Sequence, residues 1–301
     1  MVFVFVRSGD TWAYHQTLTT ISPHDAFGAG GKPIAIDGDT AVIGASYDTN
    51  SGIESAGAAY VFTRSGVTWA LQQKLVDPDP QWMLRFGHSV AIDGDTVVVG
   101  AFGDELPGPL SEAGSASVFT RVGSTWTFQQ KLTAEDAHEY DQFGTYVAIS
   151  GDSILVTSAY HCHLGEWCDY GATYVFTWTG TAWDQQQEFS PDDVQLSQGF
   201  GSRGVEIVGD TAVVASAFDS NHAYSAGSAY FFTRSGSTWT QRQKLVPDDL
   251  SAGGEFGWSL DMDGDRIIVG ARGSWKAYIY SSLFVADDFE SGETSRWSAV
   301  T

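Results

Sequence analysis

Hydrophobic and polar positions follow one scheme along most of this chain, and residues 86–142 show it most clearly. The run TVVVGA (Thr96–Ala101) is almost entirely apolar, which indicates a strand buried on both faces. The run TWTFQQKL (Thr125–Leu132) is expected to alternate, with Trp126, Phe128 and Gln130 on one side. Together with HSVAI before them and ASVFTR between them, these runs predict four strands per unit.

The connections inside this unit are of two kinds. Asp93-Gly94 joins the first two predicted strands and is a preferred two-residue hairpin turn, because both central positions need a positive φ. A short turn at Val122-Gly123-Ser124 joins the last two. The other two connections of each unit are long and differ from copy to copy. The predicted unit is therefore an antiparallel sheet with tight turns at one end and long loops at the other.

The unit recurs with a period of about 57 residues. The dipeptide Phe-Gly marks it at spacings of 59, 57, 57 and 56, and a Trp marks it at 57, 57, 57 and 56. Two independent markers with one period indicate a repeat architecture. The Phe-Gly positions begin at Phe27, Phe86, Phe143, Phe200 and Phe256, and the Trp positions are Trp12, Trp69, Trp126, Trp183 and Trp239.

A four-stranded unit cannot bury both of its faces alone, but units stacked radially bury each other. The predicted fold is therefore all-β, a β-propeller of four-stranded antiparallel blades whose repeated Phe and Trp pack between blades. Residues 1–281 would form the propeller, with 1–26 as a partial blade, and 282–301 would form a C-terminal tail. Five blades are expected, the last closed by N- and C-terminal strands, although KAYIY at 276–280 would compete for that place. The alternative is a fragment of a larger, for example seven-bladed, propeller.

The sequence FG…DGDTVVVGA…GSASVFTR resembles the FG-GAP repeat, which builds the propeller of integrin α subunits and of many bacterial extracellular proteins. The likeness is greatest to the bacterial secreted type and runs from residue 1 to about 281. It implies a propeller, a secreted or cell-surface location and a role in binding or adhesion. The tail FVADDFESGETSRWSAVT is similar to a short segment of secreted bacterial proteins and also favours export.

Members of this family often hold Ca²⁺ in the first hairpin turn of a blade through alternating carboxylates. Only the last copy keeps three, at Asp261, Asp263 and Asp265, and the later half of the family loop is missing. Calcium takes six to eight oxygen ligands, so a shortened loop is a poor site. These residues remain candidate Ca²⁺ ligands, with turn formation as the alternative, because Asp tolerates the left-handed conformation.

The net charge of −22 narrows the choice of partner. An acidic surface repels phosphate backbones and anionic lipid, which argues against nucleic acid, and no apolar run is long enough for membrane insertion. Cys162 and Cys168 lie in one long loop of the third copy, which also contains His161 and His163. A disulfide is expected there, with free thiols or a metal as alternatives.

Loops on a rigid scaffold usually carry binding, so the ligand is expected on the long-loop face. Candidate contacts are Trp82, Trp167, Asp104 and Glu105. No catalytic motif appears among the seven His residues or the Gly-rich segments, so the chain is not expected to be an enzyme. The expected function is recognition of a protein ligand by a monomer. A carbohydrate-binding lectin is the alternative, and a secreted hydrolase or lyase is a third.

Overall fold

The computed structural model of the chain describes residues 1–20, 27–161, 170–189, 191–193, 198–264 and 266–281. Among these residues the chain is all-β apart from one short 3-10 helix, η1 (Arg272–Ser274). The strands are β1 (Val2–Ser8), β2 (Thr11–Leu18), β3 (Ile34–Asp37), β4 (Thr40–Ala45), β5 (Ala58–Ser65), β6 (Thr68–Leu75), β7 (Ser89–Asp93), β8 (Thr96–Ala101), β9 (Ser115–Val122), β10 (Thr125–Leu132), β11 (Phe143–Ser150), β12 (Ser153–Ser158), β13 (Ala172–Trp178), β14 (Trp183–Phe189), β15 (Val205–Val208), β16 (Thr211–Ser216), β17 (Ser228–Ser235), β18 (Thr238–Leu245), β19 (Phe256–Asp263), β20 (Arg266–Ala271) and β21 (Lys276–Ser281).

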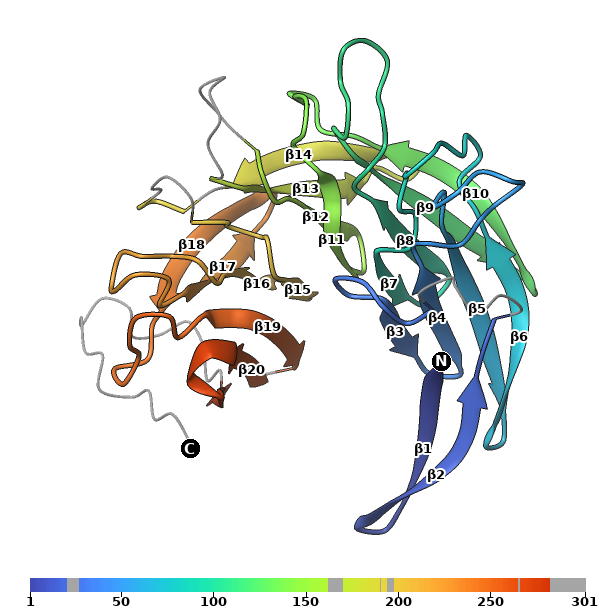
Figure 1. Cartoon of the computed structure of the whole chain (residues 1–301), viewed down its shortest axis with the longest axis horizontal. Coiled ribbons are helices and arrows are strands. Elements are labelled where there is room, and N and C mark those ends of the chain that lie inside the picture. Colours follow the sequence, from blue (N-terminus) through green and yellow to red (C-terminus); the bar gives the residue numbers. More distant parts are fainter. Residues whose placement is uncertain (21–26, 162–169, 190, 194–197, 265, 282–301) are drawn as a thin grey trace.

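These strands form antiparallel sheets in simple chain order, as expected for propeller blades. Blade 1 is β3–β6, blade 2 is β7–β10, blade 3 is β11–β14 and blade 4 is β15–β18. The blades follow one another around an arc, with the first strand of each blade inside and the last outside (Figure 1). The β-propeller and its four-stranded antiparallel blade are confirmed.

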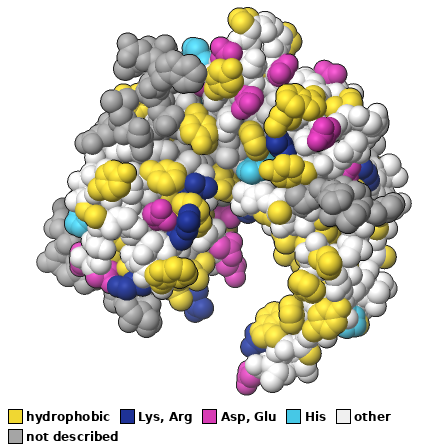
Figure 2. Space-filling model, in the orientation of Figure 1, with side chains coloured by type: hydrophobic (Ala, Val, Ile, Leu, Met, Phe, Trp, Pro, Cys, Tyr) yellow, Lys and Arg dark blue, Asp and Glu magenta, His cyan; other side chains and the backbone are white. Residues whose placement is uncertain are grey.

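The ends of the arc correct the predicted closure. The strands β1 and β2 make a sheet of their own, and β19, β20 and β21 make a three-stranded sheet. The strand β21 therefore occupies the edge of β20 that β1 was expected to take. A connection of four residues makes the β20–β21 pair, whereas β1 lies more than 250 residues away, and closing a longer loop loses more entropy. An open space separates the two ends, and apolar side chains gather on the projecting β1–β2 hairpin (Figure 2).

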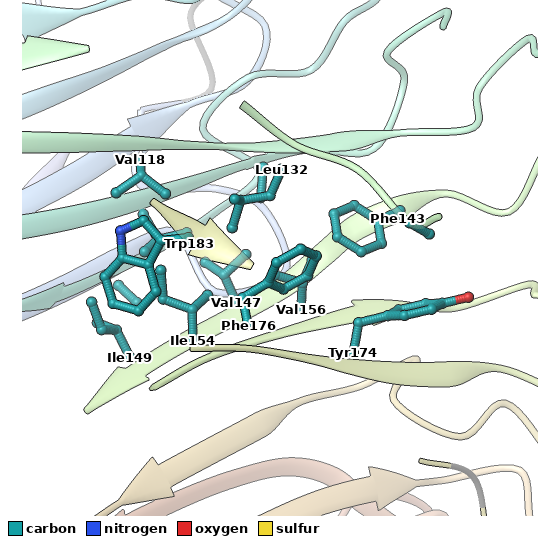
Figure 3. Packing of buried hydrophobic residues seen from close by; sticks show 14 of the residues in the cluster. Val118, Leu132, Phe143, Val147, Ile149, Ile154, Val156, Tyr174, Phe176 and Trp183 are labelled. Carbon is teal, nitrogen blue, oxygen red and sulfur yellow. The ribbon is translucent and has the colours of Figure 1, made fainter. Parts of the chain in front are cut away.

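Each blade buries two apolar faces against its neighbours. Between blades 2 and 3, Val118 and Leu132 of one blade face Phe143, Phe176 and Trp183 of the next (Figure 3). Phe143 is fully buried and packs at an angle against Phe176, with ring centroids 6.0 Å apart. The terminal hairpin lacks a neighbour on one side, and its Trp12 is exposed although Trp69, Trp126, Trp183 and Trp239 are buried.

The outermost strand of each blade does not alternate as predicted, because a β-bulge interrupts it. In β10 the register against β9 shifts between Phe128 and Gln130. Gln130 consequently reaches the next blade, where its side chain accepts from the Trp183 backbone N–H at 2.8 Å and donates to the Trp183 carbonyl at 2.7 Å. The same pair of bonds joins Gln16 to Trp69, Gln73 to Trp126 and Gln187 to Trp239. Bulges re-aim side chains in this way, and here they link successive blades.

A buried ion pair lies beneath the long loops in three of the four complete blades. The Asp stands three residues after the second strand, and the Lys stands near the end of the fourth. The pairs are Asp48–Lys74 at 2.9 Å, Asp104–Lys131 at 2.8 Å and Asp219–Lys244 at 2.6 Å. The sequence motif QKL therefore contributes a cation to the interior of each of these blades.

Candidate functional site

A pocket of about 670 Å³ opens where blades 2, 3 and 4 meet at their long-loop ends. Each blade contributes the residue that follows its Phe-Gly dipeptide: His88, Thr145 and Ser202. Each also contributes an aromatic residue that follows its second strand by one or two positions: Phe102, Tyr160 and Phe218. The remaining lining residues come from the adjoining strands and loops: Gln142, Tyr146, Ala159, Gly199, Arg203, Ser220, Tyr224 and Ser225.

Arg203 is the charged residue of this pocket. Its guanidinium carbon lies 4.0 Å from the ring centre of Trp258 and 5.1 Å from that of Phe218. Its Nε is buried without a hydrogen-bond partner, as is the Ser202 Oγ beside it. Within the described part of the chain, no carboxylate forms an ion pair with Arg203. Aromatic rings hold the guanidinium in place, but its charge is left for a ligand.

Two further side chains of the pocket, the His88 imidazole and the Tyr146 hydroxyl, are neutral near pH 7. Burial, and to a smaller extent the positive charge of Arg85, together lower the pKa of His88 to about 4. Burial raises the pKa of the Tyr146 hydroxyl, although the neighbouring Arg203 opposes this shift. The pocket therefore carries the positive charge of Arg203 inside a chain whose net charge is −22.

The depressed pKa of His88 gives a testable pH dependence. The unfolded imidazole binds its proton below about pH 6.5 but the folded one only near pH 4, so acidification favours the unfolded state. From pH 7 to pH 5.5 the free energy of unfolding should fall by about 1 kcal/mol more in the wild type than in His88→Gln. Urea unfolding at both pH values, followed by tryptophan fluorescence, measures this difference. Equal changes in the two proteins would show that His88 titrates normally in the fold.

The residues expected to contact a ligand do not gather in one place. Trp82 is exposed, and the neighbouring Gln81 bonds through its side chain to the backbone of Glu105. Glu105 lines a second, shallower hollow of about 330 Å³. Asp104 points inward instead, where it binds Lys131 and the Ser115 hydroxyl, so it is a structural residue unavailable to a ligand. Trp167 and the expected Cys162–Cys168 disulfide lie outside the described residues.

The carboxylates of the first hairpin turns act within and between blades. Asp37 accepts the backbone N–H of Gly94 at 2.7 Å, one blade further on. Asp39 and Asp95 pair with Arg64 and Arg121 of the third strand in their own blades. These contacts show that the carboxylates stabilise the turns and link neighbouring blades. In the last copy Asp261 and Asp263 are exposed, and Asp265 lies outside the described residues, so the predicted Ca²⁺ site there stays a prediction.

Sequence reasoning did not single out Arg203, and only one signal pointed to it. Arg203 stands two residues after the Phe-Gly dipeptide of its copy. The copies that begin at Phe86 and Phe256 have Ser89 and Ser259 at this position, whereas the two copies between them have Tyr146 and Arg203. Large residues at a position that is otherwise small mark a place where the copies were specialised. The convergence of three blades on one pocket was not readable from the sequence.

Comparison with known proteins agrees with this architecture. The FG-GAP repeat family matches residues 21–62, 69–119, 126–176 and 239–280, more than half of the chain. The chain therefore belongs to the FG-GAP repeat family. No curated protein matches it.

Two solved structures resemble the fold as a whole. One is a functionally unknown protein from Desulfotomaculum acetoxidans, with a TM-score of 0.58, 13% identity, and 99% of this chain and 75% of that chain covered. The other is a putative 6-phosphogluconolactonase from Bacteroides uniformis, with a TM-score of 0.51, 12% identity, and coverage of 87% and 67%. At these identities the likeness shows the fold alone.

Helices contribute little to this molecule. No helix in the described ranges has the length and apolar character needed to cross a membrane.

Proposed function

We propose that this protein is a binding module that holds an acidic group of a protein ligand in the pocket at Arg203. The observation that carries the proposal is the Arg203 guanidinium, which lies against Trp258 and Phe218 and forms no ion pair with a carboxylate of the described residues. A carboxylate can bond to two guanidinium N–H groups at once, and such charge-assisted pairs are stronger than neutral ones. The aromatic residues Phe102, Tyr160 and Tyr224 supply apolar contact area around that anchor.

The pocket supports a protein ligand better than a repeated sugar site. A lectin built on repeats would carry similar pockets in several blades, whereas this pocket is assembled from different residues of three blades. Glycan binding is the second candidate, because aromatic rings also stack on sugar rings and Arg203 would bind an acidic sugar. An adhesive role outside the cell is consistent with the family and with the net charge of −22. The proposed function therefore includes secretion of the protein or its display at the cell surface.

The experiment is a paired screen of a random displayed peptide library and a glycan array with the purified full chain. Binders are then measured by isothermal titration against the wild type, Arg203→Gln and Arg242→Gln. Arg242 is exposed on the outer strand β18, so its variant makes the same change of charge away from the pocket. Arg203→Gln should lower the affinity for an acidic peptide by about 10- to 100-fold, because one charge-assisted interaction is lost.

The outcomes separate the candidates. Acidic peptides that lose affinity in Arg203→Gln and keep it in Arg242→Gln would support the proposal. Acidic glycans with the same behaviour would favour the lectin. Binders that tolerate Arg203→Gln as well as Arg242→Gln would place recognition elsewhere on the surface and contradict the role of this pocket.

A further inference from the structure

Blade 3 departs from the buried ion pair of its neighbours. The place of Asp48, Asp104 and Asp219 is taken by His161, and the place of the lysines by Glu188. The backbone geometry is unchanged: the N–H of the residue at this place bonds to the end of the second strand, and its carbonyl accepts from a later Gly in all four blades. Glu188 pairs with Tyr174 across the sheet as Lys244 pairs with Tyr230. In blade 3 a histidine therefore stands in place of the aspartate, and a glutamate stands in place of the lysine.

In blade 4 the lysine ammonium shows where the cation belongs. The Lys244 Nζ lies 2.6 Å from Asp219 and also binds Asp193, which comes from the preceding interblade connection. The corresponding connection before blade 3 supplies Asp136, whose carboxylate oxygen lies 3.6 Å from the His161 Nε2. Ligand atoms of Asp136, His161 and Glu188 all lie within 4.8 Å of one another. These three groups therefore surround the place that an ammonium fills in blade 4.

A fourth residue orients the imidazole. The Asp141 carboxylate lies 3.0 Å from the His161 Nδ1 and is itself buried. A carboxylate that accepts from one ring nitrogen fixes the tautomer and directs the lone pair of the other nitrogen outward, as second-shell carboxylates do at metal sites. In His161 that other nitrogen, Nε2, faces Asp136.

We propose that Asp136, His161 and Glu188 bind a divalent transition-metal ion, of which Zn²⁺ is the probe, at the place taken by lysine in the other blades. Two ligand atoms about 2.0 Å from a tetrahedral ion lie about 3.3 Å apart, close to the separation of Asp136 and His161. One imidazole and two carboxylates form a ligand set typical of Zn²⁺ and related ions, whereas Ca²⁺ takes only oxygen.

The charge of the site supports this assignment. Lys244 leaves one net negative charge on its two aspartates. A divalent ion would leave the same single negative charge on the three carboxylates of Asp136, Asp141 and Glu188. His161 is buried, whereas the side chain of Asp136 beside it is 42% exposed. The rival state is an imidazolium: burial lowers the pKa of His161, but Asp141, Asp136 and Glu188 outweigh burial and raise it overall.

Metal-free full chain, dialysed against Zn²⁺ and analysed by plasma mass spectrometry, tests the site. We expect one Zn²⁺ per chain and a Tm that rises with Zn²⁺ concentration, because the ion binds the folded state. Glu188→Lys should abolish both effects while the chain stays folded. The double variant His161→Asp with Glu188→Lys recreates the neighbouring blades and should fold equally well without metal. Asp141→Asn should lower the affinity for Zn²⁺ by about 10- to 100-fold.

Two further variants test whether Zn²⁺ binds at neighbouring cysteines or at His138 instead. The pair Cys162→Ser with Cys168→Ser and the single change His138→Gln should both keep the bound Zn²⁺. The proposal is overturned if the wild type binds no stoichiometric Zn²⁺, which would assign the imidazolium. It is also overturned if Glu188→Lys retains the bound Zn²⁺ while the double cysteine variant or His138→Gln loses it.

Discussion

Replacing Lys131 by methionine should lower the free energy of unfolding by about 3–5 kcal/mol, because two buried carboxylates lose the ammonium that they share. The Lys131 Nζ lies 3.1 Å from Asp77 and 2.8 Å from Asp104, and both aspartates are almost wholly buried. Burial raises the pKa of Asp104 even with Lys131 beside it, whereas the two aspartates raise the pKa of Lys131 and so favour its charged form. Urea unfolding at pH 7, followed by circular dichroism, measures the loss.

The matched control is Lys276→Met. Lys276 binds Asp249 through side chains that are 46% and 48% exposed, and an exposed pair contributes far less to stability than a buried one. The Lys131 variant should also regain stability as the pH falls from 7 toward 5. Burial raises the pKa of the Asp104 carboxyl, and loss of Lys131 removes the charge that opposes this shift, so the folded variant binds more protons than the unfolded one. Equal losses in the two variants would mean that burial of the carboxylates does not set the effect.

Replacing Gly144 by alanine should lower the free energy of unfolding by about 4 kcal/mol, among the larger effects of a single substitution. Gly144 follows Phe143 at a φ of +89°. A Cβ there would lie 2.1 Å from the Ser115 carbonyl oxygen, a backbone atom of the preceding blade. The glycine of the repeat signature is therefore needed for the close approach of two backbones, and not only for its φ.

Gly123→Ala separates these two requirements. Gly123 also has a positive φ, of +66°, but a Cβ there would meet no atom within 4 Å. Alanine at that turn should destabilise by only about 1–2 kcal/mol, the cost of the left-handed conformation. Thermal unfolding of both variants and the wild type checks the comparison. A Gly144 variant as stable as the Gly123 variant would show that neighbouring blades move apart easily.

The sequence by itself determined the repeat and the blade. Phe143 and Trp183 recur with the period because each blade must bury the same two faces, and the Asp-Gly turns set the hairpins locally. It also showed which connections are long. These features depend on residues close together in the chain, where periodicity and turn chemistry dictate structure.

Tertiary structure decided how the blades meet and what their junctions contain. The strand β21 displaced the predicted closure by β1, because a local hairpin forms more readily than a pairing between the ends of the chain. The bulge in β10 could not be foreseen, since an alternating pattern gives no sign of one inserted residue. Asp104 was expected to face a ligand, but the fold points it inward to Lys131.

The two candidate sites show the same division. Arg203 and His88 stand more than 100 residues apart, and only the radial packing of blades 2 to 4 brings them into one pocket. His161 and Glu188 were visible in the sequence as departures from the Asp and Lys of the other copies. Their meeting with Asp136 was not visible, because that residue belongs to the connection between blades 2 and 3 and reaches His161 only when the blades stack. Periodicity determines each blade, whereas contacts between blades depend on which side chains the stacking makes neighbours.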